Sequence, residues 1–238
     1  MRKIVGLSIP VVLMCLSLWS QTKPNTASAP HRAGSPDAST EDQPDPIAII
    51  DTTVGKMNCT LFPKKAPIGV ANFIGLATGT KDWTDPTTHA KKHGVSLYDG
   101  TIFHRVIPEF MIQGGDPTGT GMGGPGYKFK NETSPDLTYD RPGRLAYANS
   151  GPDTNGSQFF ITEVPYPSLN GGYTIFGQCD DASVELVKQI ARMASDPRSN
   201  RPFRPVKINH ITIVKAGGEG GKSTPKKPVP KTPPGNTP

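Results

Sequence analysis

The segment around which the chain is organised reads FHRVIPEFMIQGGD, Phe103–Asp116. Its residues 101–106 and 110–114 have the apolar, β-branched and aromatic composition of two short strands, and Pro108 bends the chain between them. Arg105, which is permanently charged, stands among apolar, aromatic and amide side chains with no acid–base pair or metal-ligand set beside it. This pattern indicates a site that binds and polarises a neutral polar substrate.

The composition favours one domain with many turns. The 238 residues are 34% hydrophobic and include 26 Pro and 26 Gly, too many for a helical bundle. The formal net charge is +6, but four of the lysines lie beyond residue 215, so the charge is not clearly clustered on the fold. Nucleic acid is not an expected partner, because this Lys-rich tail lacks interleaved aromatic residues.

The first residues, Met1–Ser20, have the order of a secretory signal peptide. Arg2 and Lys3 precede an apolar run that is shorter than the ~20 residues of a membrane-spanning helix. The segment Ala27–Ala29 fits a cleavage site but lies rather far past the run, so an uncleaved N-terminal anchor stays open, and lipidation at Cys15 is a less favoured alternative. We therefore predict an exported protein, periplasmic or secreted, with no membrane span after signal removal.

Two polar segments flank a folded unit at residues 47–215. Residues 21–46 are rich in Thr, Ser, Ala, Asp and Pro, and residues 216–238 are rich in Gly, Lys, Pro and Thr. Neither segment can bury enough apolar surface to offset the entropy of ordering it. We therefore expect a disordered linker before the folded unit and a disordered tail after it.

The folded unit contains eight strand-like segments and two helical ones. The strands are expected at residues 47–51, 57–61, 101–106, 110–114, 144–148, 158–162, 174–178 and 206–214. One helix begins at Ala66-Pro67 and ends at Gly79, and the other is capped by Asp181. Residues 80–96 show no apolar period and are expected to form a long surface loop. These elements predict a mainly β fold, a closed eight-stranded antiparallel β-barrel capped by two α-helices.

The cysteines and histidines give no clear metal site. Cys59 and Cys179 each lie in or beside an apolar strand-like segment. They could form a disulfide in an oxidising compartment, but buried free cysteines are also common, and we expect two buried thiols. His89 and His93 could share a helix face, but no third ligand stands near them. No metal and no cofactor are therefore expected.

A family resemblance becomes specific when three motifs are read together. Phe103–Asp116, the segment NSGPDTNGSQFF at Asn149–Phe160, and Phe176-Gly177 resemble the cyclophilin family of peptidyl-prolyl isomerases. The resemblance covers nearly all of residues 47–215, in the family's order. It implies an eight-stranded barrel with two helices and an exposed groove that binds proline-containing peptides, without a cofactor.

The same resemblance implies the residues of the site. Arg105 matches the family's catalytic Arg, which would donate a hydrogen bond to the proline nitrogen of a twisting X-Pro bond. The implied substrate-binding residues are Phe110, Met111, Gln113, Ala148, Asn149, Gln158, Phe160, Leu169 and Tyr173. The apolar members would hold the proline ring, and Gln113 and Asn149 the peptide backbone. His104, beside the Arg, is expected to have a structural role.

The chain departs from common family members at four places. Ser168 stands where many members have Trp, Tyr173 where many have His, and Glu109 where Gly is frequent. The loop at residues 80–96 is longer than in the smallest members. Sensitivity to the drug cyclosporin and substrate preference are therefore open.

These observations predict a peptidyl-prolyl cis-trans isomerase that accelerates X-Pro rotation in folding exported proteins. Its expected partners are proline-containing peptides and unfolded exported proteins, and we expect a monomer. The alternatives are a non-catalytic proline-peptide-binding or scaffold module that uses the same groove, and a tethering role through the two tails. A GxGxxG match at Gly119–Gly124 has no strand-turn-helix unit around it and is interpreted as a loop.

Overall fold

The computed structural model describes residues 44–215. The predicted signal peptide, all but the last three residues of the predicted linker, and the predicted tail lie outside the described residues. No helix in the described part of the chain is long and apolar enough to span a membrane.

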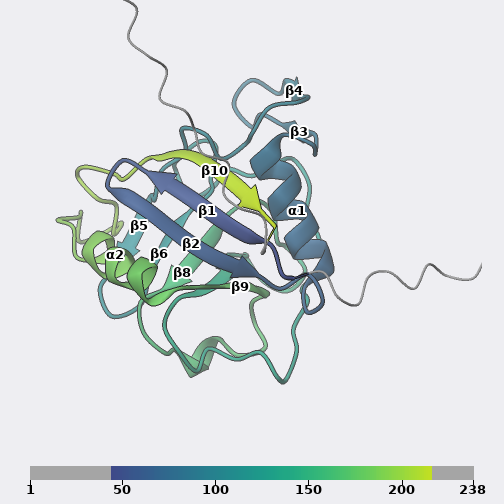
Figure 1. The fold of residues 1–238 in the computed structure, drawn as a ribbon. Helices are drawn as coiled ribbons and strands as arrows, with labels where there is room; N and C mark the ends of the chain where they lie inside the picture. The colour runs from purple at the N-terminus through teal and green to yellow at the C-terminus, as the bar shows by residue number, and fades with distance from the viewer. Residues whose placement is uncertain (1–43, 216–238) are drawn as a thin grey trace, which may run out of the picture. The chain divides into compact units, whose positions relative to one another are not determined.

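Eight strands form one antiparallel, curled sheet, as predicted (Figure 1). Their spatial order is β10 (Ile208–Val214), β1 (Ile47–Thr52), β2 (Gly55–Leu61), β9 (Ile175–Cys179), β7 (Arg144–Tyr147), β8 (Phe159–Thr162), β6 (Met111–Gly114) and β5 (Arg105–Ile107). The first and last strands of the described residues are neighbours, with Ile47 opposite Val214. The mainly β class and the eight antiparallel strands of the prediction are thus confirmed.

The two end strands of the sheet, β5 and β10, are linked near the start of β10 by contacts with the residues that precede β5. Ile102 and Lys207 form a single bridge. The N–H of Phe103 donates to the carbonyl oxygen of Val206 at 3.0 Å, and the N–H of Ile208 donates to that of Thr101 at 2.8 Å. Within the described residues no continuous ladder joins β5 to β10, so full closure of the barrel stays a prediction.

Two α-helices lie on opposite sides of strands β1 and β2 in Figure 1. Helix α1 (Pro67–Thr78) begins with Pro in its first turn and ends at Gly79, whose φ of 74° is the left-handed conformation that glycine adopts without strain. Helix α2 (Asp181–Ala191) is capped by Asp180, whose side chain accepts the N–H of Ser183 at 2.8 Å. The predicted cap, Asp181, is wrong by one residue, because Asp180 has the extended backbone of a cap and Asp181 is already helical.

The interior of the curled sheet is filled by aromatic rings. Phe73 of α1 contacts the rings of Tyr98, Phe159 and Phe176, with centroids 5.0–5.6 Å apart. All four side chains are fully buried. Each fully buried aromatic side chain stabilises the fold by roughly 1.5–3 kcal/mol, so this cluster ties α1 to strands β8 and β9.

The segment 80–96, expected to be a long surface loop, contains some regular structure. It contains a small hairpin of β3 (Trp83–Thr84) and β4 (Lys91–Lys92). The indole N–H of Trp83, which is 8% exposed, donates to the carbonyl oxygen of Val95 at 2.9 Å. His89 and His93 do not share a helix face, because His89 lies in the loop between β3 and β4, with a φ of 58°, and His93 follows β4 and pairs with Asp82.

Cys59 and Cys179 form a disulfide, so the expectation of two buried thiols is wrong. The two residues are directly opposite each other on the neighbouring strands β2 and β9. Their sequence separation is 120 residues. The local sequence around each cysteine therefore contains no sign of the other, and only the strand order brings the two sulfur atoms together.

Candidate active site

A groove of about 920 Å³ collects all ten predicted site residues on one face of the fold. Arg105, Met111, Gln113 and Phe160 come from strands β5, β6 and β8, Leu169 ends a short 3₁₀ helix (Pro167–Leu169), and the others come from loops. Segments that are far apart in sequence therefore form one continuous surface. The grouping follows from the sheet order, in which β5, β6 and β8 are adjacent.

Strand register places Arg105 on this surface and fixes its side chain. Arg105 on β5 is directly opposite Gln113 on β6, and its Nη1 donates to Gln113 Oε1 at 3.2 Å. Gln113 Nε2 donates to Oε1 of Gln158 at 2.9 Å. Gln158 Nε2 in turn donates to the carbonyl oxygens of Gly121 and Gly123, each at 2.9 Å. This network orients the guanidinium before any substrate binds.

An apolar pocket lies beside the guanidinium. Met111 and Phe160 are 1% and 5% exposed, and half-buried Phe110, Leu169 and Tyr173 pack around them. Alternation along β8 explains the placement of Phe160: Phe159 enters the aromatic core, so its neighbour faces the opposite side. The rings of Phe160 and Tyr173 meet edge to face at 5.7 Å. Aromatic side chains therefore bound much of the pocket.

Ala148, Asn149 and residues that follow them also line the groove, directly after β7. The N–H of Ala148 donates to the carbonyl oxygen of Gln158 at 3.0 Å. The side chain of Asn149 donates to the carbonyl oxygen of Gly172 at 3.0 Å and accepts the N–H of Gly151 at 3.2 Å. Asn149 thus fixes the loop that carries it against the segment near Tyr173.

The Gly-rich loop that follows β6 is organised by a buried carboxylate that the sequence did not single out. Asp116 is fully buried and accepts the N–H groups of Thr118, Gly121 and Gly123 at 2.6–3.1 Å. Burial alone would raise the pKa of Asp116, but these hydrogen bonds outweigh it and hold the pKa below its ordinary value. A Cβ on Gly123 would lie 2.0 Å from Asp116 Oδ1, so only glycine fits there. The GxGxxG match is a loop, as interpreted.

His104 is 5% exposed, and neither ring nitrogen has a hydrogen-bond partner among the described residues. Burial lowers the pKa of His104; Asp116 opposes this shift, and the cations Arg201 and Arg105 reinforce it. The imidazole is therefore neutral at pH 7 and adds no third positive charge beside the two guanidinium groups. Its predicted structural role stays a prediction.

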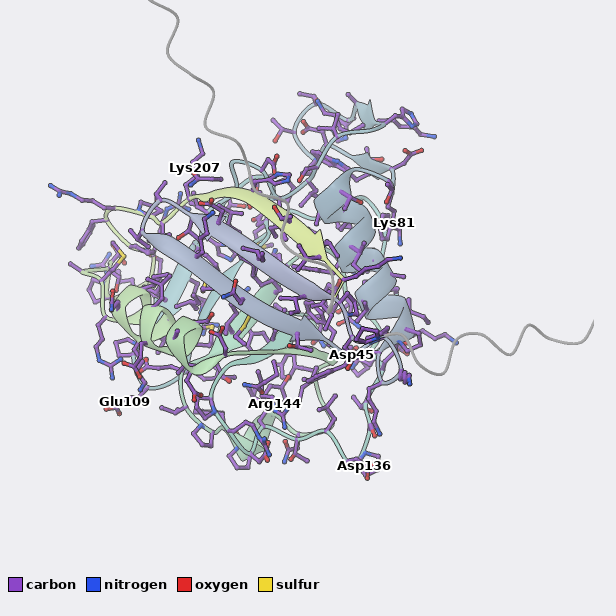
Figure 2. All side chains as sticks on the ribbon, viewed as in Figure 1. Asp45, Lys81, Glu109, Asp136, Arg144 and Lys207 are labelled. Atoms are coloured by element: carbon purple, nitrogen blue, oxygen red, sulfur yellow. A yellow bond between two sulfur atoms is a disulfide. The ribbon has the colours of Figure 1, made fainter. Side chains whose placement is uncertain are left out.

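Glu109, one of the departures from the family pattern, occupies the turn between β5 and β6. Its φ is 59°, the left-handed region in which glycine is unstrained. Its N–H donates to Oε2 of the buried Glu163 at 2.9 Å, and Glu163 also pairs with Arg192. The Glu109 side chain projects from the surface (Figure 2). The conformation gives a physical reason for the glycine that is frequent at this position.

Other parts of the groove were missed from the sequence. They include Tyr127, Lys128, Ser199 and Arg201. Ser199 and Arg201 lie after α2, in a segment with no motif, and only the fold brings them beside Arg105. Ser168, by contrast, is not among the described residues that line the groove, although its neighbour Leu169 is.

Comparison with known proteins adds to this geometry. The sequence family described as cyclophilin type peptidyl-prolyl cis-trans isomerase/CLD matches residues 47–213. The chain is 53% identical over 167 residues to peptidyl-prolyl cis-trans isomerase A of Mycobacterium tuberculosis, covering 70% of this chain and 91% of the relative. It is 48% identical over 167 residues to isomerase B of Streptomyces anulatus, covering 70% and 95%.

A solved structure is similar in three dimensions. It is a cyclophilin type peptidyl-prolyl cis-trans isomerase of Cryptosporidium parvum, determined in the presence of the dipeptide Ala-Pro. The two chains are 37% identical, with a TM-score of 0.60, and the match covers 71% of this chain and 99% of the solved one.

Proposed function

Because the chain belongs to the cyclophilin-type peptidyl-prolyl cis-trans isomerases, we propose that it uses Arg105 to rotate X-Pro bonds in proteins that fold outside the cytoplasm. The chain has the activity of this family, peptidyl-prolyl cis-trans isomerisation, and the family's ligands, proline-containing peptides. The roles of individual residues and the exported substrates are our proposal. The observation that carries it is a guanidinium held by a glutamine network beside an apolar pocket, in one groove.

The chemical problem is the barrier to rotation. Amide resonance holds the X-Pro bond planar, and rotation crosses a barrier of roughly 18–20 kcal/mol. Twisting the bond localises a lone pair on the proline nitrogen. A donor aimed at that nitrogen stabilises the twisted state more than either planar state and so lowers the barrier. Lowering it by about 7 kcal/mol would accelerate rotation roughly 10⁵-fold.

The groove supplies the parts that this mechanism needs. Met111, Phe160 and Leu169 offer an apolar surface for the proline ring, beside Arg105. Gln113 keeps the guanidinium in place, so little reorganisation is required when the amide twists. No nucleophile takes part, because no covalent bond is broken. The Ala-Pro dipeptide of the solved relative has the chemistry of the ligand that we propose for this pocket.

Export is supported by two independent observations. The N-terminal sequence has the order of a signal peptide, and the folded unit carries a disulfide between β2 and β9. Disulfides persist in oxidising compartments and are rare in reducing ones. We therefore place the proposed site of action in the periplasm or outside the cell. Cell fractionation with mass spectrometry of the mature N-terminus tests this, and an unprocessed cytosolic protein would contradict it.

The catalytic proposal is tested by cis/trans exchange of an Ala-Pro peptide. Arg105→Ala should lower kcat/KM by about 100-fold or more, whereas Arg198→Ala, an exposed Arg that does not line the groove, should leave it unchanged. Peptide binding is measured in parallel. A chain that binds the peptide but shows no exchange above background would support the alternative, a non-catalytic binding or scaffold module.

A further inference from the structure

A tight turn after α2 lies against the outer edge of β5. Ser195 and Pro202 form a bridge, and the N–H of Asp196 donates to the carbonyl oxygen of Arg201 at 2.9 Å. The carbonyl oxygen of Asn200 accepts the N–H of Val106 at 2.9 Å. Because Val106 is the neighbour of Arg105 on β5, the turn lies next to the proposed catalytic residue.

This turn places a second guanidinium on the groove wall. Arg201 lines the groove, and its Nη1 donates to the carbonyl oxygen of Gly119. That contact anchors one nitrogen of Arg201, although the residue as a whole stays exposed to solvent. In residues 44–215, neither Arg105 nor Arg201 is paired with a carboxylate.

The rest of the lining adds positive charge and no negative charge. Lys128 also lines the groove, and no described Asp or Glu does. Two carboxylates in the surrounding loops are engaged: Asp116 accepts the backbone N–H groups of its own loop, and Asp196 accepts those of Arg198 and Ser199. The neutral His104 contributes no charge. The described lining therefore carries three positively charged side chains and no negatively charged one, although its apolar pocket is made for a neutral ring.

We propose that Arg201 forms a subsite for a carboxylate side chain of the substrate in the same groove as Arg105, so that the enzyme prefers proline segments with Asp or Glu near the proline. The inference rests on the proposed function, because it assigns a substrate class to the same groove. A guanidinium already fixed at one nitrogen can still present a planar fork to a carboxylate, and Arg binds carboxylates in this way better than Lys. Arg201 is thus a specificity-determining residue.

The test uses matched proline peptides that differ only in Glu, Gln or Lys, placed in turn on each side of the proline. At one of these positions the Glu peptide should have a KM about 3- to 5-fold lower than the Gln peptide at low salt, the range of a partly exposed ion pair. The Lys peptide should have a higher KM than the Gln peptide. The preference should largely disappear near ~0.5 M salt, because exposed charges are then screened.

Variants decide whether Arg201 is responsible. Arg201→Gln should bring the Glu/Gln ratio of KM values to about one, and Arg201→Glu should reverse it in favour of the Lys peptide. Arg198→Gln removes a charge from the same turn without touching the groove and should keep the wild-type ratio. Circular dichroism spectra of the variants check that each one is folded.

The outcomes separate the two claims. Turnover of the Gln peptide without discrimination against Glu or Lys overturns the acidic subsite and leaves the isomerase intact. Equal discrimination in wild type and Arg201→Gln overturns the assignment to Arg201. Failure to turn over any of the peptides overturns the proposed function, and the subsite with it.

Discussion

Reducing the Cys59–Cys179 disulfide should lower the free energy of unfolding by several kcal/mol. The bond joins residues 120 positions apart. In the chain-entropy description, opening a loop of that size returns about 16 cal/mol/K to the unfolded chain, or about 5 kcal/mol at 25 °C. A typical domain is stable by only about 5–15 kcal/mol, so this one bond represents a large fraction of the total.

The folded state should survive reduction and lose little of its own energy. The cysteines are 0% and 2% exposed, and the strands that carry them stay paired through Thr60 and Gln178, and through Leu61 and Gly177. Two buried thiols fill nearly the same space as the bond. Residual structure in the reduced unfolded chain offsets part of the entropy, so we expect a loss of about 2–5 kcal/mol.

Urea unfolding, with and without a thiol reductant, measures the effect. The double variant Cys59→Ala/Cys179→Ala should be as unstable as the reduced protein and insensitive to the reductant. The slope m should rise on reduction, because a chain without the cross-link exposes more surface when it unfolds. Isomerase activity of the folded reduced protein should be unchanged, since neither cysteine lines the groove. A stability loss below about 1 kcal/mol, or two free thiols in the untreated protein, would refute the reasoning.

Three further predictions concern single side chains. Glu109→Gly should stabilise the protein by about 1 kcal/mol, because the native φ of 59° strains any residue with a Cβ; urea unfolding measures the gain, and Glu109→Ala, which keeps the Cβ, should show none. Gln113→Ala should lower kcat/KM for an Ala-Pro peptide by roughly tenfold or more, because Arg105 loses its hydrogen-bond partner. An unchanged kcat/KM in a folded Gln113→Ala protein would contradict this. Asp180→Ala should cost about 1 kcal/mol of stability through loss of the cap of α2. Asp181→Ala, in the first turn without the bond to Ser183, should cost less, and equal losses would argue against the cap.

Much of the fold was predictable because its signals are local. Alternating or continuous apolar runs marked all eight strands of the main sheet, and Pro67 with Gly79 marked both ends of α1. The ten site residues were named from family motifs, and the structure brings all of them to one groove. Their individual roles stay predictions until the variants are measured.

Two features that could not be predicted from the sequence depend on which segments become neighbours in the fold. The disulfide follows from the pairing of β2 with β9, and the position of Arg201 follows from the packing of a motif-free turn on β5. The β3–β4 hairpin is only two residues long on each side, too short for a periodic pattern. The cap of α2 was misplaced because Asp180 and Asp181 are chemically identical and only the backbone conformation distinguishes them.

The pairing of the first strand with the last has a consequence for how the enzyme itself folds. Ile47 lies opposite Val214, so β1 lacks one of its two neighbours until the whole folded unit has been synthesised. Contacts between such distant residues close the largest loops and are therefore slow to form. During synthesis, β2 can pair with β1 at once, but the other edge of β1 stays open until β10 emerges. The final step in folding this isomerase is therefore expected to be the docking of its own C-terminal strand.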